Sequence, residues 1–214
     1  MKRFALVISA LTKYLLGLLM VGLLVFLPAG TILYPGGLLF TALLFIPMFF
    51  LGVVLLLKAP ELLEKRLRSK EKESEQKSVI ALSLLMFLGG FIAAGLDFRF
   101  GWTHIPVGVS SVAAVLLLVS YGLYAEVMRE NAYLSRTIKV EEGQKVVDTG
   151  LYGIVRHPMY AVTIWLFLMI PMILGSWYAL IAFAFYPAII IIRLTDEEKL
   201  LTRELSGYDD YKKK

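Results

Sequence analysis

Residues 159–192, MYAVTIWLFLMIPMILGSWYALIAFAFYPAIIII, form one unbroken apolar run that decides the fold. A helix rises about 1.5 Å per residue and about 20 residues cross a hydrocarbon layer of roughly 30 Å, so this run is too long for one span. Near its middle stands GlySer at 175–176, preceded by Pro171, a combination typical of a tight turn. The run therefore predicts a helical hairpin that crosses the membrane twice.

The rest of the chain has the same character, with 58% hydrophobic residues and a mean hydropathy of +0.74. Further apolar runs lie at about 5–34, 38–57, 78–96 and 105–128. The start MKRF imitates a signal peptide, but its apolar region is longer than the usual ~7 to 15 residues, so we expect a retained span that begins after Lys13. These features predict an all-α, polytopic integral membrane protein with about six transmembrane helices, a C-terminal helical hairpin and a cytoplasmic tail helix.

Basic residues predict the topology, because cytoplasmic loops are enriched in Lys and Arg. Six spans place Lys2 and Arg3, the loop 58–77, the segment 129–157 and the tail 193–214 on one side, and these hold twenty of the 22 basic residues. Arg99, in the short loop 97–104, is on the opposite side. Both termini are therefore predicted to be cytoplasmic, with 58–77 as an exposed helical linker.

Composition also excludes several classes of function. The net charge of +5 follows from this topology, so it does not indicate a nucleic-acid partner. The chain has no cysteine, which excludes disulfides, thiolate metal sites and a cysteine nucleophile. We assign no metal ligands, and nothing in the sequence indicates an oligomeric state.

Polar and aromatic residues gather where the final hairpin begins, in GLYGIVRHPMYAV at 150–162. A strand-like segment, IKVEEGQKVVDTG at 138–150, precedes them. Arg193 and Glu197 follow the hairpin and are four residues apart, so they share one helix face. Taken separately, His157 could cap a helix that starts at Pro158, and Arg193 and Glu197 could form a helix salt bridge worth a few tenths of a kcal/mol. Because the hairpin returns both clusters to one membrane face, we predict that together they form a functional site.

These motifs carry a family resemblance. The order TG-x-Y-x-x-x-RHP-x-Y, an apolar hairpin with a central GlySer, R-x-x-x-E-E-x-x-L and EL-x-GY-x-x-Y resembles the isoprenylcysteine carboxyl methyltransferase family and its bacterial and archaeal relatives. Phospholipid N-methyltransferases are also similar. In this chain the motifs occupy 149–160, 193–201 and 204–211, and the resemblance is specific from about residue 129 onward. Val162 departs from the pattern, since the family often has glycine there.

The resemblance implies a pocket for S-adenosylmethionine in the C-terminal half. The residues that match cofactor-binding positions are Gln144, Lys145, Val146, Val147, Tyr152, His157, Pro158, Met159, Tyr160 and Glu197. Arg193 matches the residue that meets the acceptor, so Arg193 and Glu197 are the expected catalytic pair. The implied domains are an N-terminal two-span region with its charged linker, 1–77, and a methyltransferase-like membrane domain, 78–214.

The resemblance thus implies a membrane-embedded methyltransferase acting on a lipophilic or lipidated acceptor. A carboxylate such as an isoprenylcysteine-like carboxyl group needs no general base, because it is ionised at pH 7. A phospholipid or other lipid amine is the alternative acceptor, with Glu197 or Glu198 as the group that would deprotonate it. A non-enzymatic small transporter or scaffold is a third possibility, which would explain the spans without the motifs. We expect the cofactor to enter from the cytoplasm and the acceptor from the surrounding membrane lipid.

Overall fold

A computed structural model describes residues 3–67, 74–134, 140 and 142–213. Its helices are α1 (Arg3–Ala29), α2 (Pro35–Lys58), α3 (Pro60–Leu67), α4 (Ser74–Phe100), α5 (Val107–Glu130), α6 (Pro158–Leu174), α7 (Trp177–Phe183), α8 (Tyr186–Glu204) and α9 (Tyr208–Tyr211), with a short 3-10 helix at Gly150–Gly153. No β-strand occurs in these described ranges, which confirms the all-α prediction. The strand-like prediction for 138–150 is wrong for the part that is described; residues 138, 139 and 141 lie outside it.

The spans match the predicted apolar runs. Among the described residues, five helices are long and apolar enough to cross a membrane, namely Phe4–Ala29, Pro35–Lys58, Ser78–Phe100, Val107–Glu130 and the combined Trp177–Glu204. A further helix, α6, is also apolar but shorter. The chain is therefore a multi-pass membrane protein. Helix α1 continues through Lys13 without a break.

The predicted turn in the last apolar run is present. Gly175 ends α6 with a φ of 78°, which glycine adopts without a steric penalty, and the Ser176 hydroxyl accepts a 3.1 Å hydrogen bond from the Ala179 N–H at the start of α7. The second arm of the hairpin is interrupted, however, between α7 and α8. Pro187 lies in the first turn of α8 and has no N–H to continue the helical ladder from α7, so the break follows from the proline.

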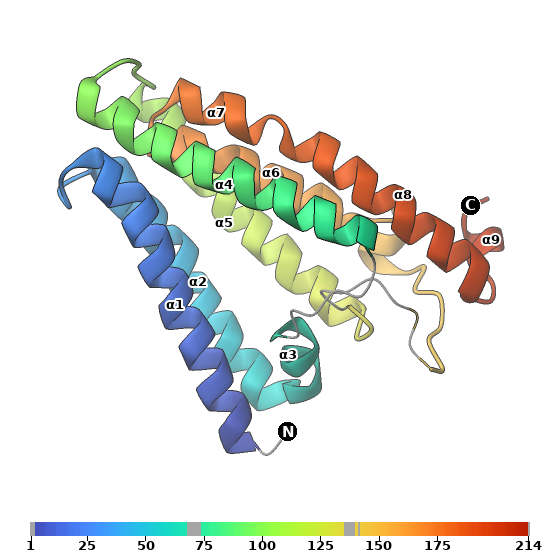
Figure 1. Cartoon of the computed structure of the whole chain (residues 1–214). Coiled ribbons are helices and arrows are strands. Elements are labelled where there is room, and N and C mark those ends of the chain that lie inside the picture. The colour runs from blue at the N-terminus through green and yellow to red at the C-terminus, as the bar shows by residue number, and fades with distance from the viewer. Residues whose placement is uncertain (1–2, 68–73, 135–139, 141, 214) are drawn as a thin grey trace.

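The helices form two groups that are joined at one end. Figure 1 shows α1 and α2 as a hairpin that lies beside α4 at the end away from the chain termini and diverges from it toward the other end. The shared core contains Phe40 of α2, Phe91 of α4 and Phe183 of α7. A side chain at Gly90 would overlap the Phe183 ring, so this glycine permits the close packing of α4 on α7. The packing of the long apolar helices therefore fixes where the ends of α5, α6 and α8 lie relative to one another.

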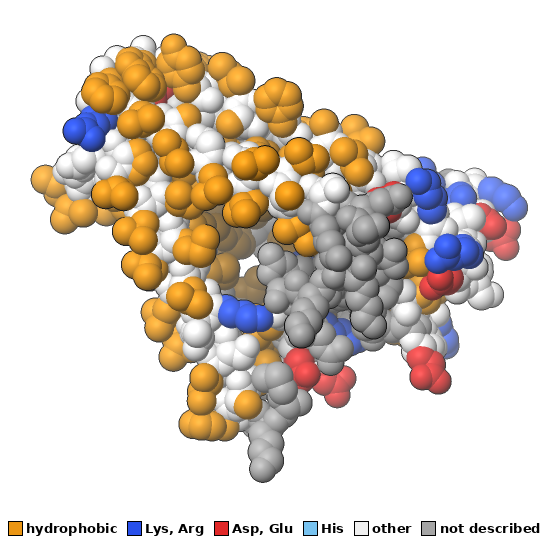
Figure 2. Space-filling model, viewed as in Figure 1, with side chains coloured by type: hydrophobic (Ala, Val, Ile, Leu, Met, Phe, Trp, Pro, Cys, Tyr) orange, Lys and Arg blue, Asp and Glu red, His pale blue; other side chains and the backbone are white. Residues whose placement is uncertain are grey.

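Charge and apolar surface separate along the molecule. Figure 2 shows apolar side chains over most of the visible face and most of the Lys, Arg, Asp and Glu side chains at the end where α3, α8 and α9 lie. Exposed apolar residues such as Leu19, Val115 and Ile181 face outward along the spans, as expected where lipid replaces water as the solvent. This arrangement agrees with the predicted clustering of basic residues on one side.

A buried carboxylate holds the opposite end together. Asp97 is 1% exposed and accepts hydrogen bonds from the Thr103 N–H at 2.7 Å, the Thr103 hydroxyl at 2.5 Å and the Ser176 hydroxyl at 2.5 Å. Asp97 was expected in a loop, but α4 continues past it to Phe100. These bonds tie the end of α4 to the turn between α6 and α7.

Candidate active site

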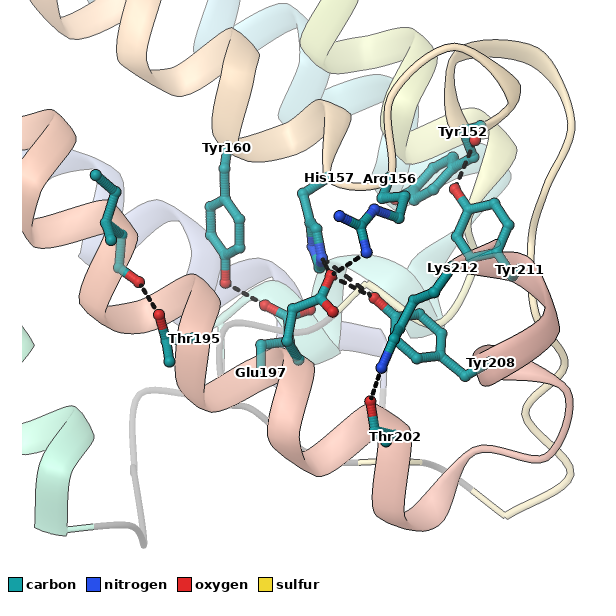
Figure 3. A network of polar contacts seen from close by, with 12 residues as sticks. Tyr152, Arg156, His157, Tyr160, Thr195, Glu197, Thr202, Tyr208, Tyr211 and Lys212 are labelled. Atoms are coloured by element: carbon teal, nitrogen blue, oxygen red, sulfur yellow. Dashed lines mark hydrogen bonds and ion pairs between the residues drawn. The ribbon is translucent and has the colours of Figure 1, made fainter. Parts of the chain in front are cut away.

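The polar cluster is built where the start of α6 faces the end of α8. Figure 3 shows Arg156, His157 and Tyr160 pointing from the first turn of α6 and the residues before it toward Glu197 and Tyr208. Pro158 is the first residue of α6, where its missing N–H breaks no helical hydrogen bond. Helix α8 extends beyond the apolar part of its sequence to Glu204, and this extension carries the acidic partners.

Glu198 is the centre of one hydrogen-bond network. Its Oε1 lies 2.7 Å from His157 Nε2, accepts a 2.9 Å hydrogen bond from the Tyr208 hydroxyl and lies 3.5 Å from Arg156 Nη1. His157 is the N-cap residue of the helix that starts at Pro158, as the sequence allowed, but its side chain makes no capping hydrogen bond and contacts Glu198 instead. The network links α6, α8 and α9 through four polar side chains.

Tyr160 is the centre of a second network. Arg193 Nε donates a 3.1 Å hydrogen bond to the Tyr160 hydroxyl, and that hydroxyl donates to Glu197 Oε2. Arg193 and Glu197, which share a face of α8, therefore meet at a common group on α6. Tyr160 is itself 4% exposed, so this chain of hydrogen bonds lies at the boundary between the core and the polar cluster.

Tyr152 is anchored by two hydrogen bonds. Its hydroxyl accepts a 3.0 Å hydrogen bond from Asn131 Nδ2, and its carbonyl accepts a 2.5 Å hydrogen bond from the Tyr211 hydroxyl. Burial, the largest effect, raises the pKa of Tyr152 to about 12, so the phenol stays protonated. Next to it, the Glu130 carboxylate accepts the Leu151 N–H at 2.9 Å. A side chain at Gly150, whose φ is 55°, would overlap that carboxylate.

Aliphatic and tyrosine side chains complete the wall of the site. Leu205, Tyr208 and Tyr211 form a small buried cluster on which Val140, Val146 and Leu201 pack. Burial, followed by its hydrogen bond to Glu198, raises the pKa of Tyr208 well above the usual value, so its hydroxyl acts as a donor. The extended segment around Val146 is thereby fixed against α8 and α9 without any strand pairing.

These elements enclose a cavity of about 70 Å³. Its lining includes all ten residues that match cofactor-binding positions, Gln144, Lys145, Val146, Val147, Tyr152, His157, Pro158, Met159, Tyr160 and Glu197. Arg193 is not in the lining and reaches it through Tyr160. Ligand pockets commonly measure roughly 300–1,000 Å³, so a nucleoside-sized ligand requires the wall to move outward. The wall at 144–147 has neither helix nor strand.

Sequence reasoning gave no role to several residues that the structure brings into the cavity or its network. Tyr208 and Tyr211 belong to the EL-x-GY-x-x-Y motif, so this motif held a signal for both. Glu198 was considered only as a base for a lipid amine, and not as the centre of a network. Asn131, just after α5, carried no signal beyond its position after a span. Val162 is buried in α6, one turn from the cavity-lining Pro158. Among the residues that the structure describes, no group of three metal-ligating side chains comes together.

Comparisons with known proteins support the predicted resemblance. Residues 112–203, from within α5 to near the end of α8, match the isoprenylcysteine carboxyl methyltransferase (ICMT) family, which confirms the resemblance over this part of the chain. "Uncharacterized protein YpbQ" of Bacillus subtilis (strain 168) is 32% identical over 91 residues, which are 42% of this chain and 54% of that protein. The matched region thus spans about half the length of this curated relative.

Proposed function

We propose that this chain is an S-adenosylmethionine-dependent methyltransferase of the membrane, acting on a lipophilic acceptor. One observation carries the proposal: residues from the segment 144–147, from 152–160 and from α8, chosen for their match to cofactor-binding positions, line a single cavity. That cavity lies mainly within the part of the chain that matches the methyltransferase family. The proposal places the whole cofactor site in the predicted domain 78–214.

The residues present fit the chemistry of this cofactor. S-adenosylmethionine supplies a methyl group on a positively charged sulfur, and also presents an adenine, ribose hydroxyls, an amino group and a carboxylate. The Glu197 carboxylate would accept hydrogen bonds from the amino or hydroxyl groups, while Lys145 and Arg156 offer positive charge for the carboxylate. Tyr152, Val146 and Leu201 offer an apolar and aromatic surface of the kind that adenine packs against.

Arg193 and Glu197 would divide the work between acceptor and cofactor. A guanidinium holds a carboxylate through paired charge-assisted hydrogen bonds, and Arg193 is hydrogen-bonded to Tyr160, which lines the cavity. The acceptor carboxylate is already ionised at neutral pH, so the site needs alignment and exclusion of water more than it needs a base. We therefore propose a carboxylate, such as an isoprenylcysteine-like carboxyl group, as the methylated group.

A lipid amine fits the site less well. It would have to lose a proton to become a nucleophile, and the two nearby carboxylates are already engaged. Glu198 accepts from Tyr208 and contacts His157 and Arg156, and Glu197 accepts from Tyr160. Burial alone would raise the pKa of the Glu198 carboxyl, but hydrogen bonds from His157 and Tyr208 hold that pKa below its usual value, so Glu198 is a weak base, and its contacts favour O-methylation over N-methylation.

Isothermal titration of the purified protein with S-adenosylmethionine, and separately with its demethylated product, tests the proposal. We expect a dissociation constant in the micromolar range, on the order of −8 kcal/mol of binding free energy. Both ligands should also raise the unfolding temperature, because they bind only the folded protein. Absence of heat and of a thermal shift with both ligands would contradict the methyltransferase assignment.

A further inference from the structure

A second and larger cavity, of about 960 Å³, lies between α2, α3 and α5. Figure 1 shows α3 beside the end of α2 that carries Lys58, with the C-terminal end of α5 on its other side. The deeper wall is apolar and comes from two spans, with Leu51, Val54 and Leu55 on α2 and Gly122, Ala125 and Met128 on α5. The cavity is separate from the proposed cofactor site: Ala132 and Tyr133 line it, whereas their neighbours Asn131 and Leu134 line the smaller cavity.

The rim of this cavity is charged and lies where the spans end. It carries three basic side chains and two acidic ones, Lys58, Lys65, Arg129, Glu61 and Glu126, and so has a net charge of +1. Arg129 pairs with Glu126 at 2.5 Å. Lys65 Nζ lies 3.5 Å from the Ala132 carbonyl and 6.0 Å above the centre of the Tyr133 ring. An apolar wall therefore ends in a polar rim that has one positive charge in excess.

Small residues on α5 keep the cavity open. Gly122 stands inside the helix, and a Cβ added there would find nothing within 4 Å. Glycine weakens a helix interior, so its presence here is not explained by helix stability. Ala125, at nearly one turn further, is also small. The α5 wall is hollow at these two positions and is filled neither by α2 nor by α3.

We infer that this cavity binds an anionic phospholipid, with the headgroup at the rim and an acyl chain along the apolar wall. At the depth of α2 and α5 the surrounding solvent is lipid, so an acyl chain is the group available to cover Leu51, Val54 and Gly122. The rim stands at the level of the headgroups, because Lys58 and Arg129 belong to the last turns of their spans. A headgroup with one negative charge complements the rim, whereas a zwitterionic headgroup brings no net charge to it.

Native mass spectrometry of the whole protein, titrated with phosphatidylglycerol or phosphatidylcholine of identical acyl chains, tests this inference. For the unaltered chain we expect an apparent dissociation constant about tenfold lower for phosphatidylglycerol, the effect of roughly one charge-assisted hydrogen bond. Gly122→Leu fills the hollow and should abolish the binding of phosphatidylglycerol. Gly89→Leu is the matched control, because Gly89 is also inside a helix, α4, with nothing within 4 Å, and it lies outside this cavity.

Three outcomes would overturn the inference. If the unaltered chain binds both lipids with equal affinity, there is no headgroup preference. If the Gly122→Leu and Gly89→Leu variants bind phosphatidylglycerol equally well, the lipid binds elsewhere. If Gly122→Leu does not fold, the double variant Lys58→Gln/Lys65→Gln decides, since it should lower phosphatidylglycerol affinity about tenfold and leave phosphatidylcholine unchanged. Unchanged phosphatidylglycerol affinity in that variant would refute the site. Glycerol phosphate without acyl chains should not compete.

Discussion

Two neighbouring glutamates in α8 serve different partners. Successive residues of a helix point about 100° apart, so Glu197 and Glu198 reach different side chains of α6. Glu197 accepts from Tyr160, and Glu198 contacts His157 and accepts from Tyr208. The sequence pair E-E therefore supplies one carboxylate for the cavity and one that joins α6, α8 and α9.

The first prediction separates the roles of Glu197 and Arg193. Glu197→Gln should weaken S-adenosylmethionine binding about ten- to a hundredfold, the cost of losing a charge-assisted hydrogen bond of ~1.5 to 3 kcal/mol. Arg193→Leu should leave cofactor affinity nearly intact and abolish turnover. Titration calorimetry and a methyl-transfer assay measure the two effects.

Lys199→Gln is the matched control for these variants. Lys199 lies on the same helix, its side chain is 72% exposed and it pairs with Asp196 at 3.6 Å, so its loss should change neither quantity. If Glu197→Gln and Arg193→Leu instead have equal, small effects on cofactor affinity and on stability, the two residues are a helix salt bridge and the division of roles is wrong.

The second prediction concerns Tyr208 at high pH. Burial and the hydrogen bond to Glu198 raise the pKa of Tyr208 above its usual value of 10.0. Above that pH the unfolded chain releases the phenol proton while the folded chain keeps it, so the free energy of unfolding falls as the pH rises. Below it, both states keep the proton and this contribution is constant. Thermal unfolding between about pH 9 and about pH 11 should show the decline, and Tyr208→Phe should make it shallower. Identical slopes would show that Tyr208 is not held as described.

At the scale of elements, the last hairpin depends on contacts at both of its ends. Its outer turn is held by Asp97 through Ser176, and its inner ends are held by the networks of Tyr160 and Glu198. A hairpin that is fixed at its turn presents the start of α6 and the end of α8 at a constant separation. The far carboxylate therefore stabilises the hairpin at its turn, while the contacts of Tyr160 and Glu198 hold the site at the other end.

The third prediction tests this far contact. Ser176→Ala removes the donor to Asp97 and the cap of α7, leaves a buried carboxylate with one partner fewer, and should destabilise the protein by ~1–3 kcal/mol. The unfolding temperature should fall, while cofactor affinity below that temperature stays within about twofold, because the site is at the opposite end. Ser111→Ala is the control, because Ser111 is exposed on α5 and its hydroxyl donates a 2.9 Å hydrogen bond to the Val107 carbonyl one turn earlier. A loss of cofactor affinity as large as that expected for Glu197→Gln would contradict a purely structural role.

At the scale of the whole molecule, the separation of charge predicts the orientation in the membrane. The side carrying α3, α9 and the proposed site holds most of the basic residues, and this is the side we predict to be cytoplasmic. The division into domains 1–77 and 78–214 also stays a prediction.

The fourth prediction uses the absence of native cysteines. Glu61→Cys and Lys212→Cys should react with a membrane-impermeant maleimide only after the membrane is opened, and His104→Cys should react in intact cells. All three positions are exposed in the structure, so accessibility within the protein does not limit the reaction. Labelling of Glu61→Cys in intact cells would reverse the proposed topology.

What the sequence determined by itself was the set of spans, the turn at 175–176 and ten of the residues that line the cavity. The length of an apolar run predicts a span, and Gly and Pro predict a turn, because these effects depend only on neighbouring residues. The order of the motifs identifies cavity residues from their positions along the chain. What only the tertiary structure decided was which groups meet: Tyr160 between Arg193 and Glu197, Glu198 with His157 and Tyr208, and Asp97 with Ser176. These pairs are separated along the chain and depend on helix rotation and packing, which no local pattern encodes. The break at Pro187 could have been predicted from the sequence, because a proline removes the same hydrogen bond in any helix.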